Sequence, residues 1–260
     1  MIKTTFGRAF LALAAAAALF ILPVIPASQA AGSGGMSDAE KKEIGAVVRE
    51  YLLNNPGILR DMMAALEAKE GREKAELQGK ALSQNADNIF RDKRDVVLGN
   101  PKGDVTLVEF FDYNCGFCKR ALGDLHKLLE TDKNLKVVMK EFPILSAGSL
   151  GAAKVSLGVA KQGKYMEFHS ALMNARGQAN AERALAIAEK LGLDMKKLKA
   201  DMNDGEVMGA ITSAAMLANS LGINGTPAYI IDGTIVAGAV GVEALRAQIA
   251  KVREKGCKYC

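Results

Sequence analysis

Apolar residues in the first third of the chain recur at helical spacing and then become sparse. Between residues 37 and 66 they return every three or four positions, which predicts two helices separated by a stop at Asn54–Gly57. Ser37 and Glu40 have the Ser-x-x-Glu form of a capping box at the start of the first helix.

Residues 69–94 are rich in Glu, Lys, Arg and Gln, with few apolar positions, which is typical of an exposed charged helix or a helical linker. We therefore expect residues 31–95 to form a helical arm. Such an arm either lies on the main domain or serves oligomerisation.

From residue 96 onward the pattern alternates between strands and helices. A β-rich run, Val105 to Tyr113, predicts a buried strand, and the helix after it carries Leu122, Leu125 and Leu128 on one face. Leu135 to Ile144 predicts the next strand. A strand–helix–strand unit of this kind implies two parallel strands joined by a right-handed crossover.

Residues 146–222 are predominantly helical and too long to be a loop, so they predict an inserted helical layer. Two short strands follow, Ala228–Ile231 and Thr234–Ala237, and then a final helix, Val242–Glu254. We expect an α/β fold over residues 96–255, with a short tail at 256–260.

The first thirty residues have the pattern of a cleavable secretory signal. Lys3 and Arg8 precede the apolar run Phe10–Ile25, which ends in prolines and the small residues around Ser28 and Ala30. The alternative is an uncleaved membrane anchor, but the apolar run is shorter than the roughly 20 residues of a membrane-spanning helix. We therefore expect export to the periplasm, an oxidising compartment in which disulfides persist.

Composition narrows the classes of function. The net charge is only +5 and aromatic residues are 5% of the chain, so a basic, base-stacking nucleic-acid surface is not indicated. An apolar content of 49% is that of an ordinary globular protein, which excludes disorder of the whole chain.

The sequence Cys115-Gly116-Phe117-Cys118 lies where the predicted strand gives way to a helix. At a helix N-terminus the free backbone N–H groups and the helix dipole stabilise a thiolate. This placement predicts that Cys115 is the attacking thiolate of disulfide exchange and that Cys118, one turn on, is the resolving thiol. A structural disulfide and half of a four-cysteine zinc site are the alternatives.

Together these motifs resemble the thioredoxin fold, and more narrowly the periplasmic DsbA-like thiol–disulfide oxidoreductases. The resemblance covers about residues 96–255 and rests on the strand before Cys115, the helical insertion and Thr226-Pro227. It implies a cis-proline at Pro227, with the backbone of Thr226 free to pair with an extended substrate. It also implies a buried acid at Glu109, six residues before Cys115, which accepts or relays the proton of Cys118.

Two features depart from the DsbA pattern. Gly116 and Phe117 replace the usual dipeptide with His and are closer to the Gly-Tyr of periplasmic disulfide isomerases, which also carry Thr before the cis-proline. The N-terminal helices resemble, more weakly, the oligomerising extension of the ScsC-like branch, which is linked to copper-stress tolerance.

We therefore expect an exported oxidoreductase that assists disulfide formation in exported proteins and is reset by a membrane redox protein, with no organic cofactor or metal. An oligomeric isomerase or reductase is the alternative within this class. Outside it, the alternatives are a metal-binding module whose thiolates bind copper or zinc and a non-catalytic chaperone whose arm binds client proteins. For Cys257 and Cys260 we expect a local disulfide, with a second redox relay or a metal clip as the other readings.

Overall fold

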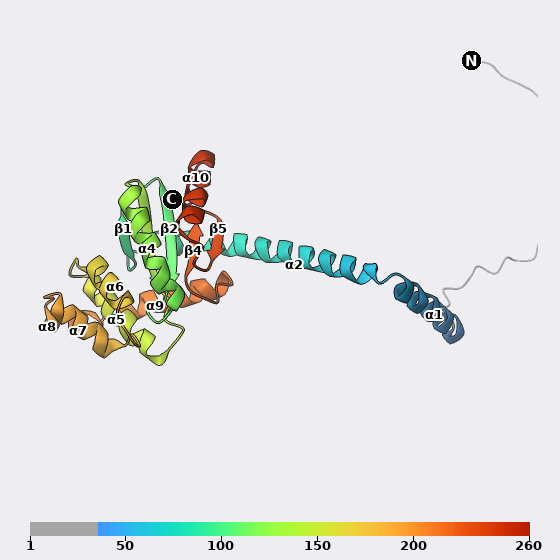
Figure 1. Ribbon diagram of the computed structural model, residues 1–260, viewed down its shortest axis with the longest axis horizontal. Helices are drawn as coiled ribbons and strands as arrows, with labels where there is room; N and C mark the ends of the chain where they lie inside the picture. Colours follow the sequence, from blue (N-terminus) through green and yellow to red (C-terminus); the bar gives the residue numbers. More distant parts are fainter. Residues whose placement is uncertain (1–35) are drawn as a thin grey trace, which may run out of the picture. The chain divides into compact units, whose positions relative to one another are not determined.

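The computed structural model describes residues 36–260, so the expected secretory signal lies outside the described residues. Figure 1 labels most of the helices and strands of the described chain. In chain order they are α1 Asp38–Asn54, α2 Gly57–Gln84, α3 Ala86–Phe90, β1 Val96–Gly99, β2 Val105–Phe111, α4 Gly116–Thr131, β3 Leu135–Glu141, α5 Ala147–Ala160, α6 Tyr165–Met173, α7 Ala181–Lys190, α8 Met195–Asp201, α9 Gly205–Ser220, β4 Ala228–Ile231, β5 Thr234–Ala237 and α10 Val242–Lys255.

The five strands form one sheet in the order β1-β3-β2-β4-β5. Strands β2 and β3 are parallel, which confirms the predicted strand–helix–strand unit, and the other neighbours are antiparallel. All seven residues of β2 are buried, because this central strand has strands on both sides and helices on both faces.

Alternation along the strands divides the core between the two faces of the sheet. Leu107 and Phe111 of β2 pack in one cluster with the apolar residues of α4 and α10, while Val108 and Phe110 pack in a second cluster with α3 and α9. Glu109 lies between Val108 and Phe110 and therefore shares the face of Leu107 and Phe111, which α4 covers.

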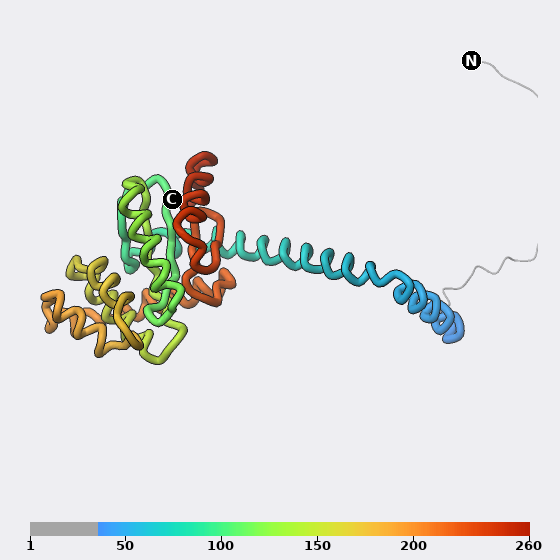
Figure 2. The backbone as a smooth tube through the Cα atoms, in the orientation of Figure 1, coloured from blue at the N-terminus to red at the C-terminus, as the bar shows by residue number. Residues whose placement is uncertain are grey.

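Helices α5 to α9 form the expected insertion between β3 and β4, and Figure 2 shows the yellow and orange helices α5 to α8 grouped beside the sheet. Strand β3 ends at Glu141, three residues before the predicted Ile144. The reason is local: Phe142 N–H still bonds to Phe111 O, but the N–H groups of Ile144 and Leu145 turn to the carboxylate of Asp112.

The described chain divides into two compact units, one ending at Met62 and the other beginning at Met63. In the first unit, α1 starts with the predicted capping box between Ser37 and Glu40. None of its residues is buried, and its apolar face is exposed, namely Ile44, Val47, Val48, Tyr51 and Leu52.

The second unit includes the last part of the segment that we expected to be an arm. Leu82, Ile89 and Phe90 are fully or almost fully buried in the cluster beneath β2. Lys140 of β3, also fully buried, donates hydrogen bonds to Asn88 O and to the carboxylate of Asp95. Residues 82–95 are therefore held by the domain core, although their composition is that of an exposed helix.

Candidate active site

Cys115 lies at the N-cap of α4, four residues after the end of β2 at Phe111. Its thiol donates a hydrogen bond to the carbonyl oxygen of Thr226 at 3.0 Å, across 111 residues of sequence. Cys115 and Cys118 are both free thiols and both buried, whereas Phe117 between them is 57% exposed. The structure therefore places the sulfur of Cys115 at a helix N-terminus, a position where free backbone N–H groups favour negative charge.

The peptide bond between Thr226 and Pro227 is cis, as the family resemblance implies. It lies directly before β4, and the carbonyl of Pro227 accepts a hydrogen bond from Gly238 N–H at the end of β5. This backbone contact and the Cys115 thiol hold the Thr226–Pro227 segment against the cysteine pair.

Cys118, one helical turn further on, is 2% exposed. Burial raises the pKa of its thiol well above the ordinary value, and the nearby Glu109 and Cys115 raise it further. The buried thiol of Cys118 therefore strongly favours the protonated form.

Glu109 is 5% exposed in the middle of β2. Burial raises the pKa of its carboxyl from 4.5 to about 8, with a further contribution from the negative charge of Asp124. Such a carboxyl carries a proton at neutral pH and lies on the face of the sheet that packs against the helix of Cys118.

Tyr229 is a member of this site that sequence reasoning did not identify. It lies opposite Glu109 in the antiparallel pairing of β2 and β4, and it is 3% exposed. Burial raises the pKa of its phenol, and Glu109 and Cys118 add to the rise. The available signal was its position two residues after Pro227 in a strand, which places both side chains on one face.

Asp112 and Asn114 form a second set that was missed. The carboxylate of Asp112 accepts hydrogen bonds from the N–H groups of Asn114, Ile144 and Leu145 and from the hydroxyl of Ser149, at 2.8 to 2.9 Å. The side-chain amide of Asn114 bonds to both the N–H and the carbonyl of Ala179. These two residues tie the turn before Cys115 to the inserted helices.

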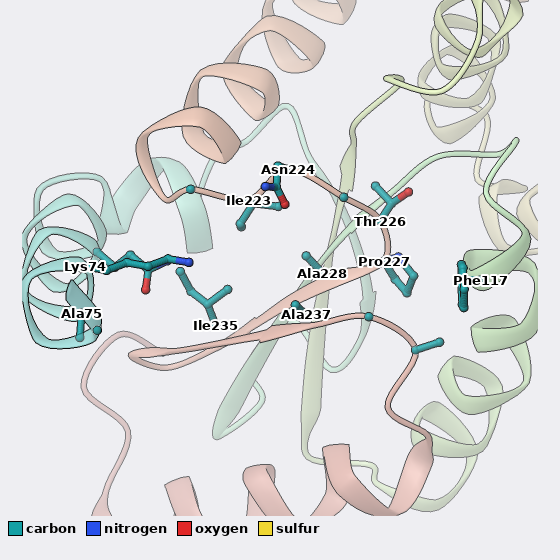
Figure 3. A pocket seen from close by; sticks show the side chains of 16 residues that line it. Lys74, Ala75, Phe117, Ile223, Asn224, Thr226, Pro227, Ala228, Ile235 and Ala237 are labelled. Carbon is teal, nitrogen blue, oxygen red and sulfur yellow. The ribbon is translucent and has the colours of Figure 1, made fainter. Parts of the chain in front are cut away.

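A groove of about 610 Å³ lies beside the cis-proline (Figure 3), and we call it the cis-proline groove. Phe117 borders it on one side and α2 on the other, where Gln78 donates a hydrogen bond to Leu221 O at 2.8 Å. Its remaining lining comes from Gly71, Lys74, Ala75, residues 222–228 and the end of β5. The groove is therefore continuous with the segment that contacts the Cys115 thiol.

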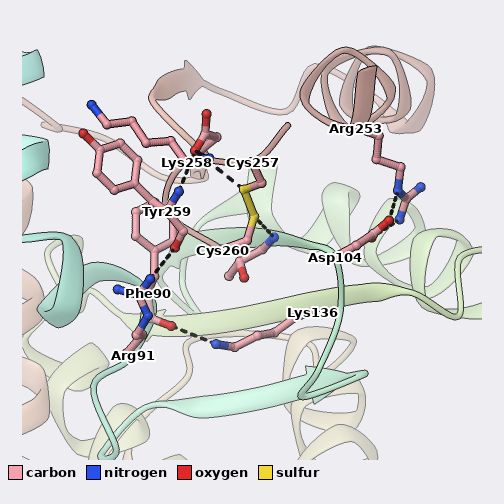
Figure 4. The surroundings of a disulfide bond; sticks show 11 residues. Phe90, Arg91, Asp104, Lys136, Arg253, Cys257, Lys258, Tyr259 and Cys260 are labelled. Atoms are coloured by element: carbon pink, nitrogen blue, oxygen red, sulfur yellow. Dashed lines mark hydrogen bonds and ion pairs between the residues drawn. A yellow bond between two sulfur atoms is a disulfide. The ribbon is translucent and has the colours of Figure 1, made fainter. Parts of the chain in front are cut away.

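The second cysteine pair lies elsewhere. Cys257 and Cys260 form a disulfide, as expected, but the tail that carries them is ordered by contacts with the domain, shown in Figure 4. Cys260 contacts Thr106 at the start of β2, whereas Cys115 follows the other end of that strand. The structure thus separates the two pairs instead of joining them in one four-cysteine site, and within residues 36–260 it shows no cluster of His, Cys, Asp and Glu suited to a metal ion.

Comparison with known proteins gives matches over most of the described chain. Residues 106–250 match the DSBA-like thioredoxin domain family, and residues 40–73 match the copper resistance protein ScsC N-terminal domain. None of the helices in residues 36–260 is long and apolar enough to cross a membrane.

Solved structures agree with these matches. A thioredoxin-like oxidoreductase from Silicibacter pomeroyi is 43% identical, with a TM-score of 0.63 over 65% of this chain and 97% of that one. The thiol-disulfide exchange protein alpha-DsbA2 from Wolbachia pipientis is 30% identical, with a TM-score of 0.64 over 69% and 98%. Proteus mirabilis ScsC in a transitional conformation is 28% identical, with a TM-score of 0.62 over 85% and 100%.

Several curated relatives that match this chain are Na(+)/H(+) antiporters. A Na(+)/H(+) antiporter NhaA 3 from Salinispora tropica is 27% identical over 171 residues, which are 63% of this chain and 26% of the antiporter. The chain thus spans about a quarter of the length of the curated relatives it matches. Since the family match covers more than half of its residues, the chain belongs to the DSBA-like thioredoxin domain family.

Proposed function

We propose that this chain is an exported thiol–disulfide oxidoreductase that exchanges disulfides with protein substrates through Cys115 and Cys118. The observation that carries the proposal is the placement of Cys115 at a helix N-terminus, with its sulfur 3.0 Å from the Thr226 carbonyl beside a cis-proline. Exported proteins are the proposed substrates, and a membrane redox protein resets the cysteines. The leader pattern of residues 1–30 supports export to the periplasm.

The proposed chemistry follows from the positions of the two thiols, since Cys115 lies at the N-terminus of α4 and Cys118 is buried one turn further on. The Cys115 thiolate attacks a substrate disulfide, forms a mixed disulfide and releases one substrate thiolate. Cys118 then gives up its proton, attacks the Cys115 sulfur and releases the second substrate thiolate, which leaves a Cys115–Cys118 disulfide. In the oxidising direction the same steps run in reverse, and Cys118 leaves as a thiolate that must be protonated.

Glu109 is the proposed proton carrier for Cys118. A buried thiolate is costly, so transfer of its proton to a nearby base or from a nearby acid lowers the barrier in either direction. A carboxyl whose pKa is about 8 holds both forms in useful amounts near neutral pH. Its place on the sheet face beneath α4 supports this assignment.

The Glu109→Gln variant is expected to slow resolution of the mixed disulfide by roughly 10²-fold, a typical loss when a general base is removed. In the wild-type protein the carboxylate form increases with pH and reaches half at about pH 8, so the resolution rate should rise through that pH and level off above it. Rapid-quench detection of the mixed disulfide on Cys115 measures the resolution rate of the wild-type protein and of the variant at each pH. An unchanged rate and pH profile in the variant would remove the proton role.

Glu109 also makes folding stability depend on pH. Because its pKa in the folded protein lies above the unfolded value of 4.5, the folded state retains a proton that the unfolded state releases. The free energy of unfolding should therefore fall as pH rises from about 4.5 to about 8, and this component should be absent in the Glu109→Gln variant. Urea unfolding across this pH range measures it.

The groove beside Pro227 is the proposed place for the substrate segment that flanks the reacting cysteine. Its lining brings together the exposed ring of Phe117 and the Thr226–Pro227 backbone. A main chain running past Thr226 keeps its own cysteine within reach of the Cys115 sulfur, and neighbouring side chains then enter the groove.

We propose dithiol oxidation as the broad role and oligomeric disulfide isomerisation as the second candidate. The second candidate is supported by α1, a capped helix whose apolar face is exposed, and by the match of residues 40–73 to the ScsC N-terminal domain. A single helix with such a face gains stability by packing against copies of itself.

Reactivation of a scrambled-disulfide protein, run beside oxidation of a reduced peptide, tests the direction. Strong reactivation favours the isomerase, whereas rapid peptide oxidation without reactivation favours the oxidase. Failure of both in the folded protein would contradict the proposed function itself.

Substituting the apolar face of α1 tests the oligomer. Val47→Lys, at a position 62% exposed, is expected to dissociate the assembly because it places an unpaired charge in an apolar contact. Ala46→Lys adds the same charge at an exposed position on the opposite side of the helix and should leave the assembly intact. Sedimentation equilibrium measures the molecular masses of the two variants. Equal molecular masses would argue against assembly through this face.

A further inference from the structure

The Cys257–Cys260 disulfide has no part in the proposed mechanism. Its short loop and partial burial are unusual for a disulfide that only stabilises the fold. Only two residues separate the cysteines, and a disulfide that closes so short a loop restrains the unfolded chain very little. Both cysteines are only partly buried and pack against the edge of the core, so the pair lies at the domain surface.

The disulfide is held by contacts from three parts of the domain (Figure 4). Asp232, in the turn between β4 and β5, accepts hydrogen bonds from the N–H groups of Lys258 and Tyr259 at 2.8 and 2.9 Å. The ring of Tyr259 stacks on Phe90 of α3 with centroids 5.9 Å apart. These contacts hold the segment 256–260 in one place without fully burying either cysteine.

The third contact distinguishes the two sulfurs. Thr106 N–H, at the start of β2, donates a hydrogen bond to the sulfur of Cys260 at 3.2 Å. Strand β4 pairs with β2 only from Leu107 onward. The Cys260 sulfur therefore accepts the Thr106 N–H at the position where the next residue of a paired strand would lie. Cys257 instead follows the C-terminal end of α10 and lies 3.6 Å from an Asp232 carboxylate oxygen, where negative charge is disfavoured.

We propose that Cys257–Cys260 is a second redox site, which exchanges its disulfide with an external dithiol independently of Cys115 and Cys118. A thiolate of the dithiol attacks the sulfur of Cys257, and Cys260 leaves as a thiolate that receives the Thr106 hydrogen bond. The second thiol of the dithiol then attacks its own bound sulfur and expels Cys257. Both cysteines end as thiols after taking up two protons, and the dithiol ends as a disulfide, so two electrons have moved.

Reduction also has a structural consequence. Without the bond between the two cysteines, the segment 256–260 loses the covalent restraint that keeps Cys260 on Thr106 and Tyr259 on Phe90. The Thr106 N–H then becomes open to solvent, which gives a readout that is separate from the chemistry of the thiols.

The test uses the full chain carrying Cys115→Ser and Cys118→Ser, so that its result does not depend on the proposed function. The protein is equilibrated in buffers of reduced and oxidised dithiothreitol, thiols are trapped with iodoacetamide, and masses are measured. Reversible reduction of the folded protein is expected over about two decades of the dithiothreitol ratio. Exchange of the Thr106 amide should accelerate at least about tenfold in the reduced form.

The Cys257→Ser/Cys260→Ser variant, which keeps Cys115 and Cys118, is the matched control. If Cys257–Cys260 stays oxidised in the buffer that reduces the Cys115–Cys118 disulfide of this control, the proposal is wrong. It is equally wrong if the bond is reduced only together with loss of the circular dichroism of the folded state, since the disulfide is then purely structural. Unchanged exchange at Thr106 would contradict the release of the segment.

Discussion

Replacing Cys115 by Ser is expected to lower the rate of disulfide exchange by at least about 10³-fold, since removing the nucleophile of a catalytic unit costs this much or more. A serine hydroxyl is not ionised at neutral pH and forms no mixed disulfide. It still fits the site, where Cys115 donates a hydrogen bond to Thr226 O, so the fold should be retained. Oxidation of a reduced, fluorescent peptide measures the loss.

Two further variants separate the role of Cys115 from that of the other sulfurs. Cys118→Ser should allow the first attack but accumulate the mixed disulfide, because no resolving thiol follows. Cys257→Ser/Cys260→Ser removes the pair at the opposite end of β2 and should keep peptide oxidation at the wild-type rate. Wild-type turnover in the Cys115→Ser protein would overturn the assignment of the nucleophile.

The Asp112→Ala variant is expected to lose about 3 kcal/mol or more of the free energy of unfolding, because each buried donor left without an acceptor costs about 1–3 kcal/mol. The carboxylate of Asp112 accepts four hydrogen bonds and is 1% exposed. Its removal deprives three backbone N–H groups of this acceptor, whereas the Ser149 hydroxyl keeps Ser146 as a partner. Denaturant unfolding measures the change.

Asn100→Ala is the control for this prediction. Asn100 also accepts a hydrogen bond from the backbone two residues on, Lys102 N–H at 2.9 Å, but this contact is exposed. Its loss should cost less than about 1 kcal/mol. If Asp112→Ala costs no more than this control, the turn before Cys115 is held by other contacts.

The parts of the fold that were predictable from sequence are those with a local periodic pattern. The strands Ala228–Ile231 and Thr234–Ala237 have the predicted bounds, and the final helix, Val242–Lys255, differs from prediction by one residue. In each, apolar positions recur with the period of the element and a turn residue marks the end. The cysteine pair was predictable for the same reason, since a strand and a helix meet there.

What could not be predicted depends on contacts between distant residues. The segment around Ile89 and Phe90 has too few apolar positions to indicate burial, and it is buried because β2, β3 and α9 present a complementary face. The order of residues 256–260 comes from Asp232 and Phe90, more than twenty residues away. Strand alternation puts Tyr229 on the face of Pro227, but only the register of β2 and β4 places it opposite Glu109.

The contact between Asn114 and Ala179 has a consequence for exchanging parts between relatives. The side-chain amide of Asn114 bonds to both backbone groups of Ala179, as a neighbouring strand would, so the turn before Cys115 and the loop before α7 fit only as a matched set. A chimaera that takes the cysteine motif from one parent and the inserted helices from another would break this match. Crossover points placed before residue 112 and after residue 180 would transfer the turn and the loop together, with the contact between them intact.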